Sequence, residues 1–342
     1  IARDHVPHTI FYQWALRALA GFFACEPRAD AILERRNSLG LDELVRRIVV
    51  DANIQAWLVD YGYASGETYD HVQLAALVPC RVEPILRLEP LIERLIVESP
   101  DFDSLYDAYR EALSDLRAAG YIALKSIIAY RAGLDIQATT RQEATAAFAP
   151  LKEQARREGT VRIESKPLLN FLLIAAMEQA HRQEFPIQIH TGFGDPDLDV
   201  VNVNPGLLRL VLHDERYRGA KIVLLHAAYP YGRTLGYLAA VYPNVYADFG
   251  LAIPFVAGDA RGVVRDLLGL APASKVLYSS DAFSIPELYW LAATLGRRTL
   301  AAVLDEYIAD GLIGEPTAVE MAEMILWRNA EQLYRQEGSV QE

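Results

Sequence analysis

The chain has 342 residues, 52% of them apolar, and a formal net charge of −12, so it can bury a large core. The acidic balance argues against nucleic acid as a partner, because no basic excess is present to neutralise phosphates. Two cysteines exclude a disulfide framework, so we expect a cytoplasmic protein. No apolar run reaches the roughly 18 residues of a membrane span, so we expect no membrane partner.

The first fifty residues are predicted to be helical, notably residues 10–25 and 41–51. We interpret residues 1–52 as a helical subdomain that packs beside a larger domain of residues 53–342. No low-complexity stretch, repeat or flexible linker divides the larger domain further.

Seven short, continuously apolar runs follow and are predicted to be strands: 55–60, 81–88, 121–125, 186–190, 221–226, 244–249 and 276–280. Continuous rather than alternating apolar residues are typical of parallel strands covered on both faces. Amphipathic patterns between them predict helices over 104–119, 140–158 and 166–183, with further starts at Pro205 and Pro316, the last helix running to about residue 334. This alternation predicts an α/β protein with a parallel sheet.

A closed barrel needs eight strands, and only seven are predicted. An open doubly wound sheet is the alternative, but no GxGxxG motif opens a helix. We therefore predict a (β/α)8 TIM-like barrel with an N-terminal helical insertion. The first strand is expected to be missing from the chain as given, which begins at Ile1 rather than Met.

Three of the predicted strands end on residues that can carry chemistry: His190, His226 and Asp281. Parallel strands deliver their last side chains to the carboxyl edge of the sheet, where barrel enzymes hold their active sites. Imidazole and carboxylate groups bind divalent metals, and a carboxylate beside an activated water can move its proton. One such histidine alone would be read as structural, whereas the recurrence on separate strands favours a site.

Two cationic side chains lie at other strand ends. Lys125 is either an ion-paired side chain or an interior amine that orients substrate or, carbamylated, bridges two metals. Arg87 either pairs with Glu89, whose carboxylate could also pair with Lys125, or clamps a substrate carboxylate. After the strand that ends at His226, a loop carries Tyr229 and Arg233, and these are further candidates for substrate binding.

The segments Ile-Gln-Ile-His190-Thr-Gly, Leu-Leu-His226-Ala-Ala-Tyr-Pro and Ser-Ser-Asp281-Ala resemble the metal-dependent amidohydrolase superfamily. Together with Ala-Leu-Lys125-Ser-Ile-Ile-Ala-Tyr-Arg131, they resemble its amidohydrolase-2 branch, which includes domains fused to glutamine synthetases and nodulin-like and FluG-like proteins. The resemblance spans most of the chain.

This resemblance implies a barrel that holds one or two divalent metals, which in the family are often zinc ions. It implies His190 as a metal ligand, His226 as a ligand or polarising group, and Asp281 as ligand and general acid/base. Lys125 matches a position that some members carbamylate. The family's first strand normally ends in His-x-His, a pattern this sequence lacks, and without those ligands metal affinity should be weak.

The leading hypothesis is hydrolysis of a C–N bond in a small anionic amide. The fusion of related domains to glutamine synthetases suggests an amide of the γ-glutamyl type. The alternatives are a metal-dependent decarboxylase of the same superfamily and a catalytically silent barrel that serves as sensor or scaffold. A homo-oligomer is expected by default, since most soluble oligomers are assembled from identical chains.

Overall fold

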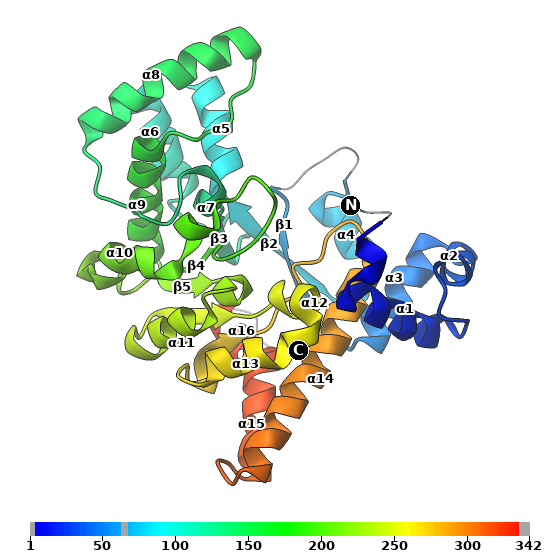
Figure 1. Ribbon diagram of the computed structural model, residues 1–342. Coiled ribbons are helices and arrows are strands. Elements are labelled where there is room, and N and C mark those ends of the chain that lie inside the picture. Colours follow the sequence, from blue (N-terminus) through cyan, green and yellow to red (C-terminus); the bar gives the residue numbers. More distant parts are fainter. Residues whose placement is uncertain (1–3, 63–67, 335–342) are drawn as a thin grey trace.

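The computed structural model describes residues 4–62 and 68–334, and the sheet within them is wholly parallel (Figure 1). Its strands are β1 (Ala56–Asp60), β2 (Arg81–Arg87), β3 (Ala123–Ser126), β4 (Pro186–Ile189), β5 (Lys221–Leu224), β6 (Val245–Asp248) and β7 (Val276–Leu277). Each pairs with its neighbour in sequence, in the order β1 to β7. The TIM-like α/β architecture is confirmed, and the eighth strand that would close the barrel is not among the described residues.

Most strand boundaries differ from the sequence prediction by one to three residues, and two of these differences bear on the site. β2 ends at Arg87, and residues 88 and 89 are the first of helix α5 (Leu88–Glu98). The Glu89 carboxylate accepts hydrogen bonds from the Ser126 hydroxyl at 2.7 Å and the Ile127 amide at 2.8 Å, which ties the start of the helix to the end of β3. The last strand is only two residues long, so Asp281 lies in the loop that follows it.

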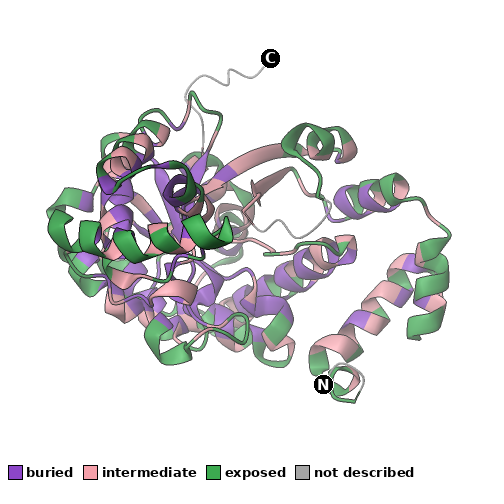
Figure 2. Ribbon diagram, turned by 90° about the horizontal axis from the view of Figure 1, so that it is seen from above, coloured by how far each residue is buried: buried purple, intermediate pink, exposed green. Residues whose placement is uncertain are grey.

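Helices cover the outer face of the sheet, and their apolar sides bury most of the large core (Figure 2). The longer ones are α5, α6 (Phe102–Ala112), α8 (Arg141–Glu158), α9 (Lys166–Arg182), α11 (Gly232–Val241), α13 (Ala260–Leu268) and α14 (Pro286–Ala309). The shorter ones are α4 (His71–Leu77), α7 (Ile128–Arg131), α10 (Arg209–His213) and α12 (Ala252–Val256). No helix of the described residues is long and apolar enough to cross a membrane.

Local capping explains why α8 has the limits predicted for it. Its N-terminus is a capping box, in which the Thr140 hydroxyl accepts from the Glu143 amide and the Glu143 side chain accepts from the Thr140 amide. Gly159 ends the helix in the left-handed conformation. By contrast, α6 stops seven residues short of its predicted end. The Gln183 side chain bonds to both Leu113 O and Leu116 N, and these tertiary bonds stabilise a turn there instead of a further helical turn.

The N-terminal region is helical, as predicted, and comprises α1 (Ile10–Phe23), α2 (Ala29–Asn37) and α3 (Leu41–Asp51). These helices share a small apolar core with α14, whose Trp290, Leu291 and Ala293 are buried in it. Arg36 also reaches α14, with its Nε 2.7 Å from a Glu287 carboxylate oxygen. A domain boundary at residue 52 stays a prediction.

The C-terminal region fills the amino-terminal end of the barrel. The single helix predicted for it is interrupted, since α15 (Glu315–Glu323) and α16 (Asn329–Tyr334) are joined by a π-helical turn, Met324–Arg328. The Asn329 amide donates to Ala273 O and Val276 O, and Gln188 donates to the Tyr334 hydroxyl at 3.0 Å. These bonds anchor α16 to β7 and β4 at this end of the barrel.

Candidate active site

The carboxyl ends of the strands gather most of the ionisable residues of the barrel interior. His190 follows β4 directly, and His226 follows β5 after one residue. Lys125 lies in β3, while Asp60 and Arg87 are the last residues of β1 and β2. Parallel pairing in register brings these ends to one edge of the sheet.

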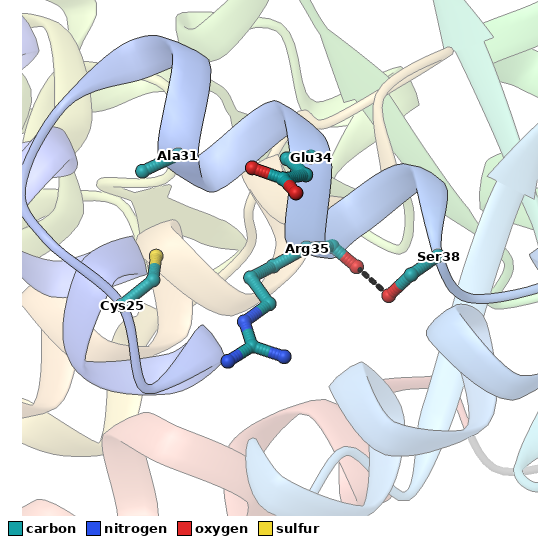
Figure 3. A pocket seen from close by; sticks show the side chains of 5 residues that line it. All are labelled: Cys25, Ala31, Glu34, Arg35 and Ser38. Atoms are coloured by element: carbon teal, nitrogen blue, oxygen red, sulfur yellow. Dashed lines mark hydrogen bonds between the residues drawn. The ribbon is translucent and has the colours of Figure 1, made fainter.

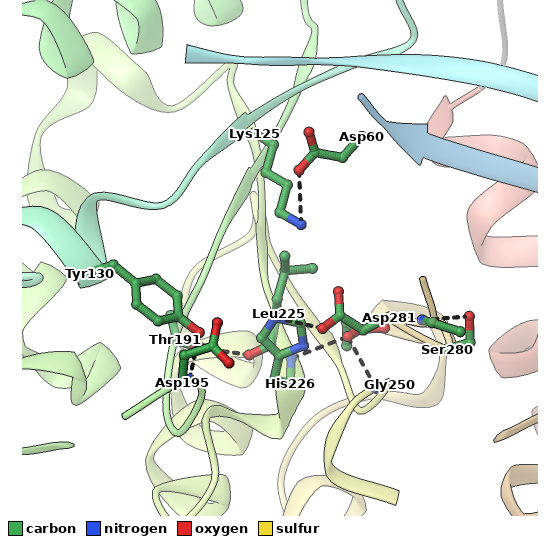
Figure 4. Close-up of polar contacts among 12 residues, drawn as sticks. Asp60, Lys125, Tyr130, Thr191, Asp195, Leu225, His226, Gly250, Ser280 and Asp281 are labelled. Atoms are coloured by element: carbon green, nitrogen blue, oxygen red, sulfur yellow. Dashed lines mark hydrogen bonds and ion pairs between the residues drawn. The ribbon is translucent and has the colours of Figure 1, made fainter. Parts of the chain in front are cut away.

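Three rings and a carboxylate form a row at this edge, the imidazole row. The ring centroids of Tyr130 and His190 are 4.5 Å apart, and those of His190 and His226 are also 4.5 Å apart. His226 Nε2 lies 4.0 Å from an Asp281 carboxylate oxygen (Figure 4). The structure therefore brings together the two histidines and the aspartate that were expected to converge.

Both imidazoles are buried, with exposed fractions of 4% for His190 and 2% for His226. Burial lowers the pKa of His190 well below its usual value, and the neighbouring His226 and Lys125 lower it further. Burial and Lys125 likewise lower the pKa of His226. Both rings are therefore neutral at pH 7, which is the state that binds metals. Within the described residues, His190 Nε2 and His226 Nδ1 have no hydrogen-bond partner.

Asp281 closes the row with a side chain about one-third exposed to solvent, at 33%. Desolvation by surrounding protein atoms raises the pKa of its carboxyl, while Lys125 and His190 act in the opposite direction. A carboxyl whose pKa is raised toward neutrality can both accept and donate a proton. Its backbone is left-handed, with φ of 50°.

A second group, the charged wall, lines the ends of β1 to β3. Asp60 Oδ2 lies 2.7 Å from Arg87 Nε and 3.2 Å from Lys125 Nζ. The exposed fractions of the three side chains are only 10% for Asp60, 10% for Arg87 and 11% for Lys125. Burial alone would raise the pKa of Asp60, but Lys125 and Arg87 outweigh it and the pKa is lowered. Two cations and one carboxylate leave this wall with a net positive charge.

Asp248, at the end of β6, fixes the backbone that presents His226. Residues His226, Ala227 and Ala228 all have left-handed backbones, with φ of 67°, 53° and 46°. One oxygen of the buried Asp248 carboxylate accepts from the His226 amide at 3.2 Å and the Gly250 amide at 3.1 Å. Burial raises the pKa of Asp248 to about 6, although these bonds oppose the shift.

The remaining candidates fall outside both groups or bind partners that were not expected. Arg87 pairs with Asp60 rather than with Glu89. Arg233 is not brought into the site, because its side chain is 86% exposed and pairs with Asp266 at 2.8 Å. Tyr229 lies at the rim, 37% exposed, with its ring edge-on to Phe193.

Three participants were missed by the sequence analysis: Asp60, Asp248 and Tyr130. Asp60 ends a predicted strand, so the reasoning that selected the histidines would also have selected it, whereas Asp248 is the last residue but one of the strand predicted over 244–249. Nothing in the sequence marks Tyr130, since its contact with His190 joins segments 60 residues apart in a way that spacing does not reveal.

The residues present fit a divalent cation as part of a ligand set. Neutral imidazole and carboxylate are suitable ligands, and His190 Nε2 is a buried nitrogen that lacks a partner among the described residues. Within residues 4–62 and 68–334, however, no three His, Cys, Asp or Glu side chains are grouped closely enough to hold a metal together. A pocket of about 330 Å³, lined by α2 and by Cys25 and Ser38 on either side of that helix, is unrelated to these strand ends (Figure 3).

Comparisons with known proteins agree with this geometry. The amidohydrolase family model matches residues 102–336. The chain is 37% identical over 236 residues to protein fluG of Emericella nidulans, which covers 66% of this chain and 26% of fluG. The chain therefore spans about a quarter of the length of that relative.

Solved structures show the same fold. A Lactobacillus casei protein assigned as a metal-dependent hydrolase superposes with a TM-score of 0.88 at 30% identity, over 99% of this chain and 89% of the other. The uronate isomerase of Thermotoga maritima superposes with a TM-score of 0.66 over 97% and 79% of the two chains, but at 15% identity it shows the fold alone.

Fold and site together define a TIM-like barrel enzyme with its chemistry at the strand ends. The chain belongs to the amidohydrolase family, in its amidohydrolase-2 branch. Membership supports a metal-dependent hydrolase and implies a divalent metal.

Proposed function

We propose that this barrel hydrolyses a C–N bond of a small anionic amide, with a divalent metal, zinc by preference, bound at the imidazole row. The observation that carries the proposal is the convergence of two neutral, buried imidazoles, one of whose ring nitrogens lies 4.0 Å from the Asp281 carboxylate. The family membership supports hydrolysis. That the bond is a C–N bond, and that the substrates include γ-glutamyl amides, is proposed in addition to what the membership supports.

The residues have distinct roles in this reaction. His190 would be a metal ligand, with His226 or Asp281 beside it as part of the same ligand set, and the metal would supply Lewis acidity when bound. Asp281 accepts the proton of the attacking water and returns it to the leaving nitrogen. The metal site and the charged wall meet at Lys125, whose charge influences both histidines.

Substrate recognition falls to the charged wall and the rim. The net positive charge shared by Arg87, Lys125 and Asp60 favours a substrate that carries a carboxylate. A carboxylate held there would place the rest of a short molecule toward the imidazole row. Tyr229 lines the rim, where a side chain can select for size.

The test combines metal analysis with an activity screen. Elemental analysis of the wild type should find a divalent metal, and a panel of γ-glutamyl and other acidic amides should include one that releases amine. His190→Ala should lose both properties, while His213→Ala, at an exposed helix position, should keep both. Carbon dioxide release without amine would point instead to the decarboxylase, and protein that binds no metal and turns over nothing would point to the scaffold.

A further inference from the structure

Tyr130 stands at the end of the imidazole row opposite Asp281, and the functions proposed so far leave it without a role. It belongs to the short helix α7, which follows β3 directly. Its ring packs against His190, with the two ring planes inclined by 53°. Its hydroxyl accepts a hydrogen bond from the Asp195 amide at 3.2 Å (Figure 4). Among the described residues, that hydroxyl donates no hydrogen bond, so its hydrogen is available to a ligand.

Gly194 shows where the hydroxyl faces. A Cβ atom at this position would lie 1.8 Å from Tyr130 Oη and 3.2 Å from His190 Nε2. The hydroxyl and the ring nitrogen therefore border the same small space. Because Gly194 has no left-handed backbone, its lack of a side chain is required by this space rather than by its conformation. A phenol donor thus lies beside the imidazole nitrogen that has no protein partner.

We infer that Tyr130 is a catalytic residue whose hydroxyl donates a hydrogen bond to the substrate oxygen that becomes negatively charged during hydrolysis. Water adds to the amide carbon, and the electron pair of the C=O double bond moves onto oxygen. The hydroxyl keeps its proton and stabilises that charge. The oxygen then re-forms the double bond as the C–N bond breaks, and the nitrogen takes its proton from Asp281. This role rests on the amide hydrolysis proposed above.

A purely structural role is the competing explanation, since the hydroxyl also accepts from the loop amide of Asp195. Tyr130→Phe separates the two, because it keeps the ring against His190 and removes only the hydroxyl. Loss of one oxyanion donor lowers kcat by about 10² to 10³-fold in enzymes of known mechanism. A structural role would instead change the metal content or the free energy of unfolding.

The experiment measures kcat, KM, metal content and urea unfolding for the wild type, Tyr130→Phe and Gly194→Ala, with the amide found in the screen. Both variants should lose kcat by about 10² to 10³-fold, with KM, metal content and stability little changed for Tyr130→Phe. Tyr231→Phe is the matched control, because it removes an exposed hydroxyl that donates to Val200 O at 3.0 Å. Its kcat should equal that of the wild type. A Tyr130→Phe kcat within threefold of the wild type would overturn the inference.

A binding measurement keeps this inference separate from the proposed reaction. Methylphosphonate, a tetrahedral oxyanion, is titrated calorimetrically into the metal-loaded wild type and Tyr130→Phe. We expect the Kd to rise at least tenfold in the variant. If this rise in Kd is seen while no amide is hydrolysed, the proposed amide hydrolysis is wrong, but the role of the Tyr130 hydroxyl as a hydrogen-bond donor to an oxyanion is retained. Equal affinity in the two proteins, or no binding by either, would show that Tyr130 is not the donor.

Discussion

Replacing Asp60 by alanine should destabilise the protein strongly, although Asp60 makes few contacts. Its carboxylate is the counter-charge of both Arg87 and Lys125, and all three side chains are about nine-tenths buried. Asp60→Ala leaves two cations near each other in a site with little access to water. Removing one partner of a buried ion pair costs about 3–5 kcal/mol, because the remaining charge stays desolvated and uncompensated.

This loss is large beside a typical total stability of about 5–15 kcal/mol. The assay is urea unfolding followed by circular dichroism at pH 7. In the Asp60→Ala background, Lys125→Met should recover part of the loss, because it removes one of the two like charges that lie close together. Such a gain from deleting a second polar group would not occur if the residues acted independently.

The Arg233–Asp266 pair provides the control. Its shortest contact is 2.8 Å, similar to that of the buried pair, but the Arg233 side chain is 86% exposed. Exposed pairs are weakened by water and salt, so Asp266→Ala should destabilise much less than Asp60→Ala. Equal losses from the two substitutions would refute the reasoning, since burial is the main difference between the pairs.

The same pair predicts a pH dependence. The folded-state pKa of Asp60 is lowered from the usual 3.8, so the stabilisation from its ionised form is present above that value. It is lost as pH falls through the lowered folded pKa. The stability difference between the wild type and Asp60→Asn should therefore be constant at neutral pH and shrink in acid, as urea unfolding at several pH values would show.

Two further substitutions test the loops that carry the histidines. Gly192→Ala should lower the free energy of unfolding in urea far more than Gly120→Ala does. Both glycines have a left-handed backbone, so the strain from that backbone is common to the two variants. A Cβ at Gly192 would also lie 2.3 Å from the Ala228 carbonyl carbon, whereas nothing lies within 4 Å of a Cβ at Gly120. Asp248→Ala should cost about 1–3 kcal/mol for each amide left unpaired. Asp248→Asn keeps an acceptor, and since the pKa of Asp248 is raised from 3.8 to about 6, the wild type should lose stability relative to this variant as pH rises through that range. If the difference in unfolding free energy between the wild type and Asp248→Asn does not change with pH, burial does not raise the pKa of Asp248.

The sheet was predictable because its strands are buried on both faces. Such strands are mostly apolar, and each of the seven predicted runs overlaps an observed strand. The prediction failed where the apolar pattern does not change at an element's end. Leu88 continues the apolar pattern of β2 but begins a helix, whose Glu89 carboxylate is held by Ser126 at the end of β3 and by Ile127 directly after it. The end of α6 is likewise set by Gln183, which lies 70 residues from its partner Leu113.

The site was predictable as far as strand ends reveal it. His190, His226 and Asp281 converge because parallel strands in register share one edge, and that rule needs no knowledge of side-chain contacts. Charge partners follow no such rule. Arg87 pairs with Asp60, which lies 27 residues away in the sequence. Arg233 pairs with Asp266 of α13, although Arg233 lies in the loop region that follows His226.

Lys125 links the two halves of the site electrostatically. Its ammonium pairs with Asp60 in the charged wall, and the same charge lowers the pKa of both His190 and His226. The amine that lowers the pKa of Asp60, and so keeps it ionised, therefore also keeps the imidazoles neutral. A protonated imidazole would repel a cation, whereas a neutral one can bind it. In the proposed function, the charged wall prepares the imidazole row for a metal and attracts an anionic substrate, so the buried ion pair beside the histidines has a role beyond stability.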